Sequence, residues 1–406
     1  MKRTAAALTA LLFLLTGCHA IEDSSVGDVV PVEVYSAPDN DYALWGDAVQ
    51  SEEEATEAPT EPMLSEGMSL EDKICQLFII TPEALTGVSV ATVCGDATKE
   101  ALDKWPVGGL IYFSANLEDM DQAKALLSGT SSHLKQSTGI APFLAVDEEG
   151  GLVARCADNL GTTALEPMQT YGDRADEAEA REIGVTLGME IQKVGFNLDF
   201  APVADVDLDP GNELGDRIFS DDPEVVAKMV AGVVEGMQGT GVAATLKHFP
   251  GLGAENGNAH EDTKIVIDRT LDQLRAEEFI PFQRGIEAGA DFVMVSHQTV
   301  TGVGDDLPAC LSPIVCTDLL RGELGFEGLI VTDSLQMNTI SANYDSGEAA
   351  VRALEAGVDV ILMPEDFEAA LQGVEDAVAE GRITEERIDE SVERVLKEKR
   401  KLGLMD

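Results

Sequence analysis

After Glu66 the chain alternates short apolar runs with longer stretches in which apolar residues recur at helical spacing. The helical spacing is clearest over 223–239, 270–288 and 347–356. Short apolar runs of this kind predict buried strands, and their alternation with helices predicts βα units around a parallel sheet. The predicted strands are 74–80, 109–113, 142–147, 196–205, 242–249, 292–297, 329–333 and 358–363.

Eight βα units over about 340 residues fit a (β/α)8 TIM-type barrel, although a doubly wound open sheet has the same local pattern. Polar residues favour the barrel, because barrels assemble their sites from the carboxyl ends of several strands. Five predicted strands end on such residues: Asp147, Asp205, Lys247-His248, Ser296-His297 and Asp333. We therefore predict one catalytic barrel domain over 67–406, closed by an amphipathic helix over 384–402.

The first eighteen residues have the pattern of an export signal. Lys2 and Arg3 precede an apolar run over 5–15, which is too short to span a membrane. The run ends in Leu15-Thr16-Gly17-Cys18, which resembles the processing box of bacterial lipoproteins. An ordinary cleaved signal with a chance cysteine is the alternative. We expect lipidation at Cys18 and an extracytoplasmic protein that contacts the cell membrane through this lipid anchor.

Charge distinguishes the next segment and limits the class of partner. From Ile21 to Glu66 there are thirteen acidic residues and no Lys or Arg, so residues 19–66 are predicted to form a disordered acidic linker. The whole chain has 27 Lys and Arg against 75 Asp and Glu, a formal net charge of −48. Such a chain repels phosphate backbones, which argues against nucleic acid as a partner. We expect a monomer.

The six cysteines do not form a complete disulfide framework. With Cys18 lipidated five remain, and an odd number leaves at least one thiol free. Cys75 lies in an apolar run and is expected in the core. Cys310 and Cys316 could either bridge or stay reduced. The spacing of Cys and His matches no zinc site. The chemistry that we predict requires neither a metal ion nor an organic cofactor.

Three of the five histidines, His248, His260 and His297, lie at strand ends or in a following loop, whereas His133 is predicted to be a surface residue. His248 belongs to Lys247-His248-Phe249-Pro250-Gly251-Leu252-Gly253. This stretch is similar to the Lys-His-Phe-Pro-Gly-His-Gly signature of family 3 glycoside hydrolases, in the β-N-acetylhexosaminidase branch. Stretches that resemble further motifs of that family follow the same order along the chain: 147–155, 197–206, 215–220 and 330–337.

The resemblance covers 68–402 and implies glycoside hydrolysis with retention, in which a carboxylate traps the anomeric carbon and a second group protonates the leaving oxygen. Asp333, at the end of the seventh strand, matches the family's nucleophile. His260 matches its acid/base, a role that suits an imidazole near neutral pH. The residues implied to bind the sugar are Asp147, Arg155, Arg217, Lys247, His248 and His297. Glu148 and Glu149 are assigned to support rather than to sugar contact.

The sequence departs from the family pattern at three positions. The family pairs its His with an Asp two residues earlier, and that position here is Asn258, which cannot stabilise an imidazolium electrostatically. Leu252 replaces the second His of the signature, and Leu152 replaces an Arg. Either another carboxylate of the same loop replaces the missing Asp, or the enzyme is weakened. The candidate carboxylates are Glu255, Glu261 and Asp262.

The function predicted from these residues is an exo-acting β-N-acetylglucosaminidase that takes a small saccharide, such as a peptidoglycan fragment, through a covalent glycosyl-Asp intermediate. A lipid-anchored sugar-binding protein on a degenerate barrel is the alternative from another class, and the retained Asp333 argues against it. A β-glucosidase of the same family and transfer to phosphate instead of water are further alternatives. Muropeptides, chitin fragments and host glycans all remain open as natural substrates.

Overall fold

The computed structural model describes residues 63–254 and 257–406, and its centre is an eight-stranded parallel barrel. The strands follow the order β11-β9-β7-β6-β3-β2-β1-β12, and a parallel bridge between Val331 and Val360 joins the two ends of that order. The predicted (β/α)8 fold and its eight strands are therefore confirmed. Their bounds are β1 Phe78–Ile80, β2 Gly109–Ile111, β3 Phe143–Val146, β6 Leu198–Asp199, β7 Ala243–Phe249, β9 Phe292–Val295, β11 Leu329–Thr332 and β12 Ile361–Leu362.

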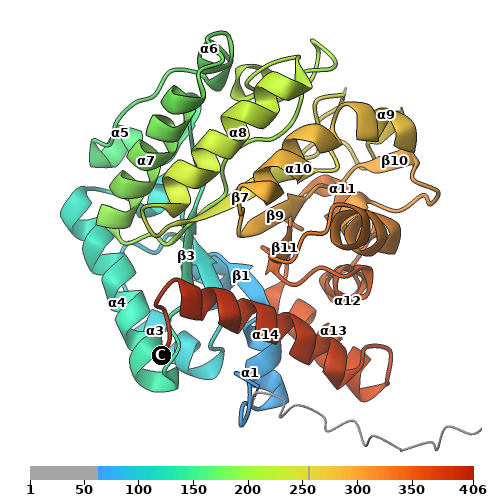
Figure 1. The fold of residues 1–406 in the computed structure, drawn as a ribbon. Coiled ribbons are helices and arrows are strands. Elements are labelled where there is room, and N and C mark those ends of the chain that lie inside the picture. Colours follow the sequence, from blue (N-terminus) through green and yellow to red (C-terminus); the bar gives the residue numbers. More distant parts are fainter. Residues whose placement is uncertain (1–62, 255–256) are drawn as a thin grey trace, which may run out of the picture. The chain divides into compact units, whose positions relative to one another are not determined.

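Helices surround these strands, and successive helices pack against one another around the barrel (Figure 1). Several begin at an Asp whose side chain accepts hydrogen bonds from the first free backbone amides, as Asp119, Asp176 and Asp222 do. The longer elements are α3 Asp96–Lys104, α4 Met120–Thr138, α7 Glu177–Val194, α8 Pro223–Gln238, α10 Phe279–Glu287, the π-helix η4 Ile314–Glu323, α12 Ser346–Ala356, α13 Phe367–Ala379 and α14 Glu385–Lys401. The shorter ones are α1 Leu70–Cys75, α2 Pro82–Thr86, α5 Ala157–Leu160, α6 Met168–Gly172, α9 Leu271–Ala276 and α11 Asn338–Ser341.

Several predicted elements differ from the structure in their bounds. The strands predicted over 196–205 and 358–363 are shorter, as β6 and β12. The run at 74–80 opens as the end of helix α1, so Ile74 and Cys75 are buried as helical residues and the strand starts at Phe78. The helix predicted over 270–288 is divided into α9 and α10. Pro281 explains the division, because its ring cannot donate a hydrogen bond to the carbonyl of Glu277 and clashes with it.

Two small sheets at the rim of the barrel were not predicted. Strands β4 Glu148–Gly150 and β5 Val153–Ala154 form an antiparallel hairpin directly after β3. Strands β8 Val266–Thr270 and β10 Thr299–Gly302 pair in parallel beyond β7 and β9. Both sheets are short and carry polar residues, so they lack the apolar run that marks a barrel strand.

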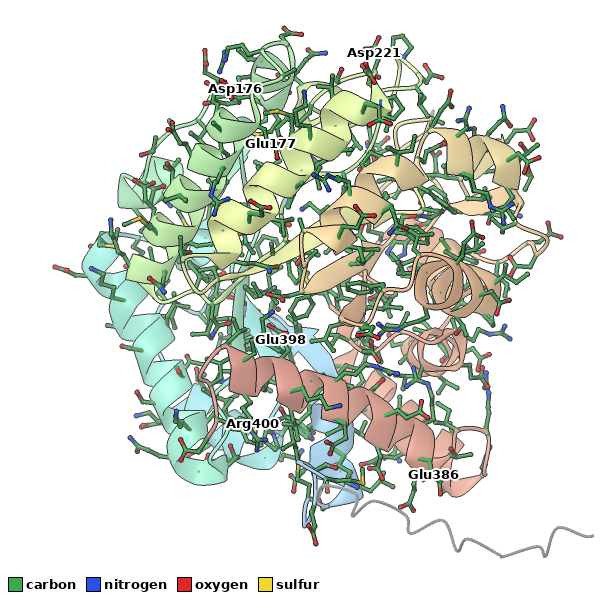
Figure 2. The ribbon with its side chains drawn as sticks, in the orientation of Figure 1. Asp176, Glu177, Asp221, Glu386, Glu398 and Arg400 are labelled. Carbon is green, nitrogen blue, oxygen red and sulfur yellow. The ribbon has the colours of Figure 1, made fainter. Side chains whose placement is uncertain are left out.

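Helix α14 is the predicted closing helix and lies beside α1 (Figure 1). Ile388, Val392 and Val395 are completely buried, as their spacing predicts. Glu386 lies in the first turn and Arg400 in the last, which complements the helix dipole (Figure 2). The residues that precede the barrel also contact this helix, since the backbone amides of Leu64 and Ser65 donate to the carboxylate of Glu393 at 3.1 and 2.8 Å.

In the described part of the chain, no helix is long and apolar enough to cross a membrane. The predicted signal peptide, Cys18 and the linker as far as residue 62 lie outside the described residues.

Candidate active site

A cavity of about 500 Å³ opens at the carboxyl ends of the barrel strands. It gathers Asp333, His260 and all six residues that the sequence assigned to sugar binding, whereas Asn258 lies outside its lining. Charged and polar groups of the wall are Asp147, Glu149, Arg155, Glu213, Arg217, Lys247, His248, His260, His297, Asp333 and Ser334. Apolar groups of the wall include Phe113, Leu252, Met294, Met337 and Met363.

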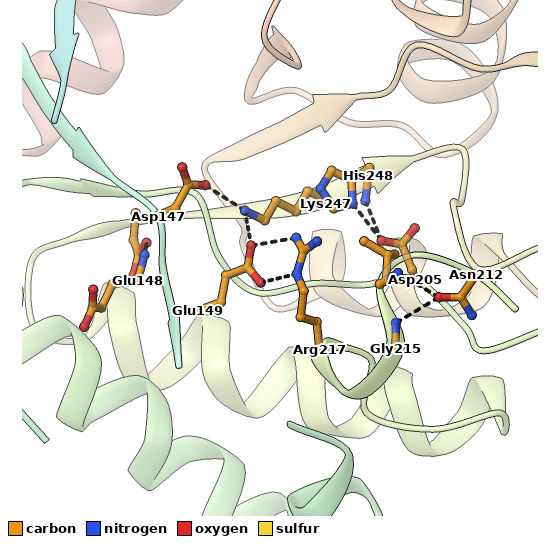
Figure 3. Close-up of polar contacts among 11 residues, drawn as sticks. Asp147, Glu148, Glu149, Asp205, Asn212, Gly215, Arg217, Lys247 and His248 are labelled. Atoms are coloured by element: carbon orange, nitrogen blue, oxygen red, sulfur yellow. Dashed lines mark hydrogen bonds and ion pairs between the residues drawn. The ribbon is translucent and has the colours of Figure 1, made fainter. Parts of the chain in front are cut away.

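A chain of ion pairs crosses the floor of this cavity (Figure 3). Lys247 Nζ donates to Asp147 Oδ1 at 2.8 Å and lies 2.6 Å from Glu149 Oε1. Arg217 donates two parallel hydrogen bonds of 2.8 Å to the same Glu149, one from Nε and one from Nη2. Glu149 thus orients both cations, which agrees with the supporting role assigned to it. Planar two-point pairing of this kind is the strong, directional form of an Arg–carboxylate contact.

The charges in this network stabilise one another. Burial alone would raise the pKa of Glu149, but Lys247 and Arg217 outweigh it and lower that pKa to about 2. Burial opposes the charge on Lys247, and the carboxylates of Asp147 and Glu149 nevertheless raise its pKa. The floor therefore keeps charged donors and acceptors at neutral pH, which is what recognition of sugar hydroxyls requires.

His248 is fixed by Asp205 at the end of the neighbouring strand segment. Its ring Nδ1 lies 2.8 Å from Asp205 Oδ2, and the other oxygen of Asp205 accepts from the backbone amide of Leu252 at 2.6 Å. Because a carboxylate oxygen accepts hydrogen bonds, Nδ1 is the donor in this contact, and Nε2 is left for the cavity. The peptide bond between Lys247 and His248 is cis.

The glycines of the signature are required by close packing. A Cβ atom on Gly253 would lie 1.5 Å from the backbone oxygen of Val206, and one on Gly251 would lie 2.7 Å from the side chain of Glu278. Gly251 also has a φ of 130°, which L side chains rarely adopt. The Gly253 contact packs the loop after β7 against the segment after β6, and the Gly251 contact packs it against Glu278 at the start of α10.

Asp333 follows β11 and is held by its neighbours. Its Oδ1 accepts from the backbone amide of Ser334 at 2.7 Å. Burial would raise the pKa of Asp333, but His297, His248, the Ser334 amide and Lys247 together lower it below the ordinary value. The Asp333 carboxyl group is therefore charged at neutral pH, as a nucleophile must be.

His297 lines the floor but uses both ring nitrogens within the protein. Nε2 lies 2.8 Å from the backbone oxygen of Ser334, and Nδ1 lies 3.2 Å from the sulfur of Cys310. A carbonyl only accepts, so Nε2 carries the proton and the Cys310 thiol donates to Nδ1. Burial lowers the pKa of His297, which favours this neutral form. His297 thus lines the cavity, as predicted, and also holds the backbone beside Asp333, whereas its contact with the sugar stays a prediction.

The β4–β5 hairpin brings Arg155 to the opposite wall. Its Nε is buried and has no hydrogen-bond partner among the described residues, so the guanidinium has donor capacity to spare for a ligand. Glu148 supports the hairpin, since its Oε2 accepts from the backbone amide of Cys156 at 2.8 Å. Leu152, which replaces the family's Arg, is 76% exposed at the hairpin tip and does not line the cavity.

His260 reaches the cavity from the loop after β7, but Asn258 does not meet its ring. Asn258 Oδ1 accepts from the backbone amide of His260 at 2.9 Å. The backbone amide of Asn258 in turn donates to Asp262 Oδ2 at 2.9 Å. The side chains of Asn258 and Asp262 therefore shape the turn. Of the other two candidate carboxylates, Glu261 is exposed and Glu255 lies outside the described residues.

Several wall residues escaped the sequence analysis. Glu213 precedes the recognised motif at 215–220, and nothing in its local pattern distinguishes it from a surface glutamate. The sequence pattern indicates core positions for three other residues of the wall, Met294, Met337 and Met363. Met363 carries a signal visible in the structure alone, a φ of 46° that non-glycine residues seldom adopt.

In the described part of the chain, the cysteines form no disulfide and no cluster of side chains could hold a metal ion. Each of the five cysteines in the described part of the chain is a free thiol, so Cys310 and Cys316 do not bridge. Cys75 is completely buried, as expected. Among the described residues, no group of three or more His, Cys, Asp or Glu side chains is arranged to hold a metal ion.

A barrel with a charged sugar-sized cavity at the carboxyl ends of its strands is typical of glycoside hydrolases, and comparison with known proteins agrees. The chain matches the N-terminal domain of glycosyl hydrolase family 3 over residues 69–397. A β-hexosaminidase of Stenotrophomonas maltophilia is 39% identical over 281 residues, which cover 66% of this chain and 80% of the relative. β-Hexosaminidase A of Pseudoalteromonas piscicida is 32% identical over 329 residues, 75% of this chain and 55% of the relative.

A solved structure is also similar. The family 3 β-N-acetylglucosaminidase from Paenibacillus sp. str. FPU-7 has a TM-score of 0.78 and 36% identity over 83% of this chain and 63% of its own. The chain thus spans less than two thirds of the Paenibacillus and Pseudoalteromonas proteins. This chain belongs to glycosyl hydrolase family 3. Its relatives are named β-hexosaminidases, which confirms the resemblance to that branch.

Proposed function

We propose that this protein is a retaining exo-β-N-acetylglucosaminidase that hydrolyses terminal non-reducing β-linked N-acetylglucosamine. The observation that carries the proposal is the convergence of Asp333, His260 and the Asp147–Lys247–Glu149–Arg217 network on one cavity. The similarity to β-hexosaminidases and to a β-N-acetylglucosaminidase supports the choice of sugar. A sugar-binding protein would have no use for a charged, desolvated Asp333, so the enzyme is the better interpretation.

The proposed reaction has two steps. The Asp333 carboxylate attacks the anomeric carbon while the imidazolium of His260 donates a proton to the leaving oxygen, which forms a glycosyl-Asp ester and a neutral imidazole. The imidazole then removes a proton from water as that water attacks the anomeric carbon, and Asp333 departs as a carboxylate. Asp147, Lys247, Arg217, Arg155 and His248 hold the sugar hydroxyls, and His297 holds the backbone that carries Asp333.

The cavity supports exo-action on small saccharides. A volume of about 500 Å³ closed below by the barrel suits one terminal sugar unit. The apolar wall formed by Met294, Met337 and Met363 offers a surface for the acetyl methyl group. Peptidoglycan fragments are the proposed natural source of such termini, since the motifs resemble the branch of the family that acts on them.

The test compares nitrophenol release from the β-N-acetylglucosaminide and the β-glucoside. We expect the N-acetylglucosaminide to be cleaved with the higher kcat/KM. Preference for the glucoside would identify a β-glucosidase. Rate stimulation by inorganic phosphate, with glycosyl phosphate as product, would identify a phosphorylase.

We also propose that the enzyme acts outside the cytoplasm, held at the membrane by lipid on Cys18. The motif at 15–18 and the acidic segment that follows it support this location.

A further inference from the structure

Among the described residues of its own loop, no carboxylate side chain forms a hydrogen bond with the ring of the acid/base histidine, His260. Within that turn, Asn258 Oδ1 is occupied by the backbone amide of His260, and Asp262 Oδ2 is occupied by the backbone amide of Asn258. Neither side chain is therefore directed to the imidazole. Among the described residues, a partner for His260 is therefore sought on a different element.

The loop between β6 and α8 presents Glu213 to His260. Both residues line the same cavity, together with Ala259, the residue before His260. Glu213 and His260 thus face the same space and lie within electrostatic range of each other.

Glu213 occupies a rigid turn. Asn212 Oδ1 accepts from the backbone amides of Leu214 and Gly215, both at 3.0 Å, and its Nδ2 donates to Asp207 Oδ1 at 2.7 Å. Figure 3 shows the Asn212–Gly215 contact beside Arg217. The next side chain, Leu214, is buried in an apolar cluster with Leu252. Leu252, the departure from the signature, therefore anchors the Glu213 turn.

We propose that Glu213 is the positioning residue of His260 and replaces, from a neighbouring loop, the carboxylate that Asn258 lacks. This inference rests on the proposed function, in which the imidazolium of His260 donates the proton. The role of Glu213 is to stabilise that imidazolium.

The groups around Glu213 favour its charged form against the effect of burial. Glu213 is solvent-exposed as a whole residue, but burial of its carboxyl group raises the pKa, and His260, Arg217, His248 and the Ala259 amide oppose that rise. The other titratable groups that face this part of the cavity are His248 on β7, His297 after β9, Asp333 after β11 and Arg217, and Glu261 and Asp262 lie on the His260 turn. Among the wall carboxylates, Asp147 and Glu149 are paired with Lys247, and Asp333 is assigned to the nucleophile.

The first experiment compares Glu213→Gln with the wild type on two N-acetylglucosaminides that differ in the acidity of the leaving phenol. A poor leaving group needs the proton of His260, so its kcat/KM should fall by about 10²-fold, within the range for general acid catalysis. An activated leaving group should lose less than about tenfold, because it departs without that proton. Asp216→Asn is the matched control, since Asp216 lies on the same turn but outside the cavity lining, and both substrates should keep their rates.

The second experiment asks whether a carboxylate at the family's position rescues the loss. Asn258→Asp alone should change turnover less than about threefold, whereas Asn258→Asp in the Glu213→Gln background should restore most of the rate on the poor leaving group. The alkaline limb of the pH–rate profile should move to lower pH in Glu213→Gln and return in the double variant. The His260 ring resonance, assigned with His260→Gln, should show the same displacement of its titration midpoint by NMR.

The outcomes separate this inference from the proposed function. Equal losses on both substrates with an unmoved pH profile would show that Glu213 acts on the fold alone, and wild-type rates in Glu213→Gln would exclude any role. Either result overturns the inference while leaving the glycosidase intact. If the wild type cleaves no N-acetylglucosaminide, the proposed function fails, and the NMR midpoint still decides whether Glu213 and His260 are coupled.

Discussion

Asp333 lies among groups that favour its charged form. The histidines of the floor, the Ser334 amide and Lys247 outweigh the effect of burial on its pKa. The same neighbours leave the carboxylate directed into the cavity rather than paired with a single cation. A carboxylate that is desolvated yet charged is a better nucleophile than one in water, because it gives up less hydration when it attacks.

Labelling tests the nucleophile directly. Incubation with a 2-fluoro or 5-fluoro glycosyl donor should leave a covalent adduct on Asp333, located by mass spectrometry of the digested protein. Asp333→Asn should lose turnover by several orders of magnitude, since removal of a nucleophile costs up to about 10⁶-fold in other enzymes. An adduct on any other carboxylate would overturn the assignment.

Glu149 is expected to matter for both stability and binding. Replacing it with Gln leaves Lys247 and Arg217 buried without their shared anion. The free energy of unfolding should fall by about 3–5 kcal/mol, as it does when a buried ion pair is broken. KM should rise as well, because both cations lose their orientation. Glu166→Gln is the surface control, since its pairing with Arg174 at 3.5 Å is exposed and should be worth less than about 1 kcal/mol.

The acid stability of these variants provides an independent check. The pKa of Glu149 is lowered to about 2 in the folded protein, so its contribution to stability is present above the unfolded value of about 4.5 and lost as the pH falls toward 2. The Tm difference between wild type and Glu149→Gln should therefore shrink as the pH falls from 5 to about 2. A difference that is constant with pH would mean that Glu149 contributes through packing instead of charge.

At the scale of the element, helix α14 packs against its neighbours and also buries a lysine, which lowers the stability of the fold when that lysine is charged. Lys399 is completely buried, its Nζ donates to Gln76 Oε1 at 2.7 Å, and it lies 5.1 Å from the centre of the Phe143 ring. Burial lowers its pKa to about 7. The charged form is thus disfavoured in the folded state relative to the unfolded state.

Lys399→Met should raise the stability of the folded protein. Below pH 7 both states of the wild type are protonated and the cost of the buried charge is greatest. Between about 7 and 10.5 the unfolded state binds more protons, so the stability of the wild type rises with pH. The Tm gain of Lys399→Met should accordingly be larger at pH 6 than at pH 10. Lys397→Met, an exposed change on the same helix, should alter Tm little at either pH, and an equal gain at both pH values in Lys399→Met would exclude the electrostatic explanation.

At the scale of the whole molecule, charge and chain organisation bear on location. A net charge of −48 gives the protein no electrostatic attraction to anionic membranes, so attachment would depend on the lipid. Cys18→Ser should convert a membrane-bound protein into a soluble one with unchanged kcat/KM. Fractionation of cells that express the two forms measures this. Recovery of the wild type free in the medium, beginning at residue 19 or later, would contradict the lipoprotein proposal.

Much of the barrel could be predicted from the sequence. Each barrel strand is a short apolar run because it is buried on both faces, and polar residues follow where the strand reaches the open end. The local pattern thus located the eight strands and brought Asp147, Lys247, His297 and Asp333 to one rim before any contact was known. The local pattern failed at two places. The run that begins at Ile74 starts as a helical turn instead of a strand, and the helix predicted over 270–288 is broken before Pro281.

The tertiary structure decided how the site residues pair. Glu149 meets a cation 68 positions away in Arg217. Glu213 lines the same cavity as Ala259 and His260, which lie more than 40 positions later in the chain. The sequence identified Asn258 as a missing partner, but the fold showed that its side chain holds a backbone amide and that a different loop supplies the facing carboxylate. Periodicity reports the burial of each residue against its own neighbours in the chain. Loop-to-loop contacts depend on how the closed barrel brings the strand ends together, and that arrangement leaves no trace in local sequence.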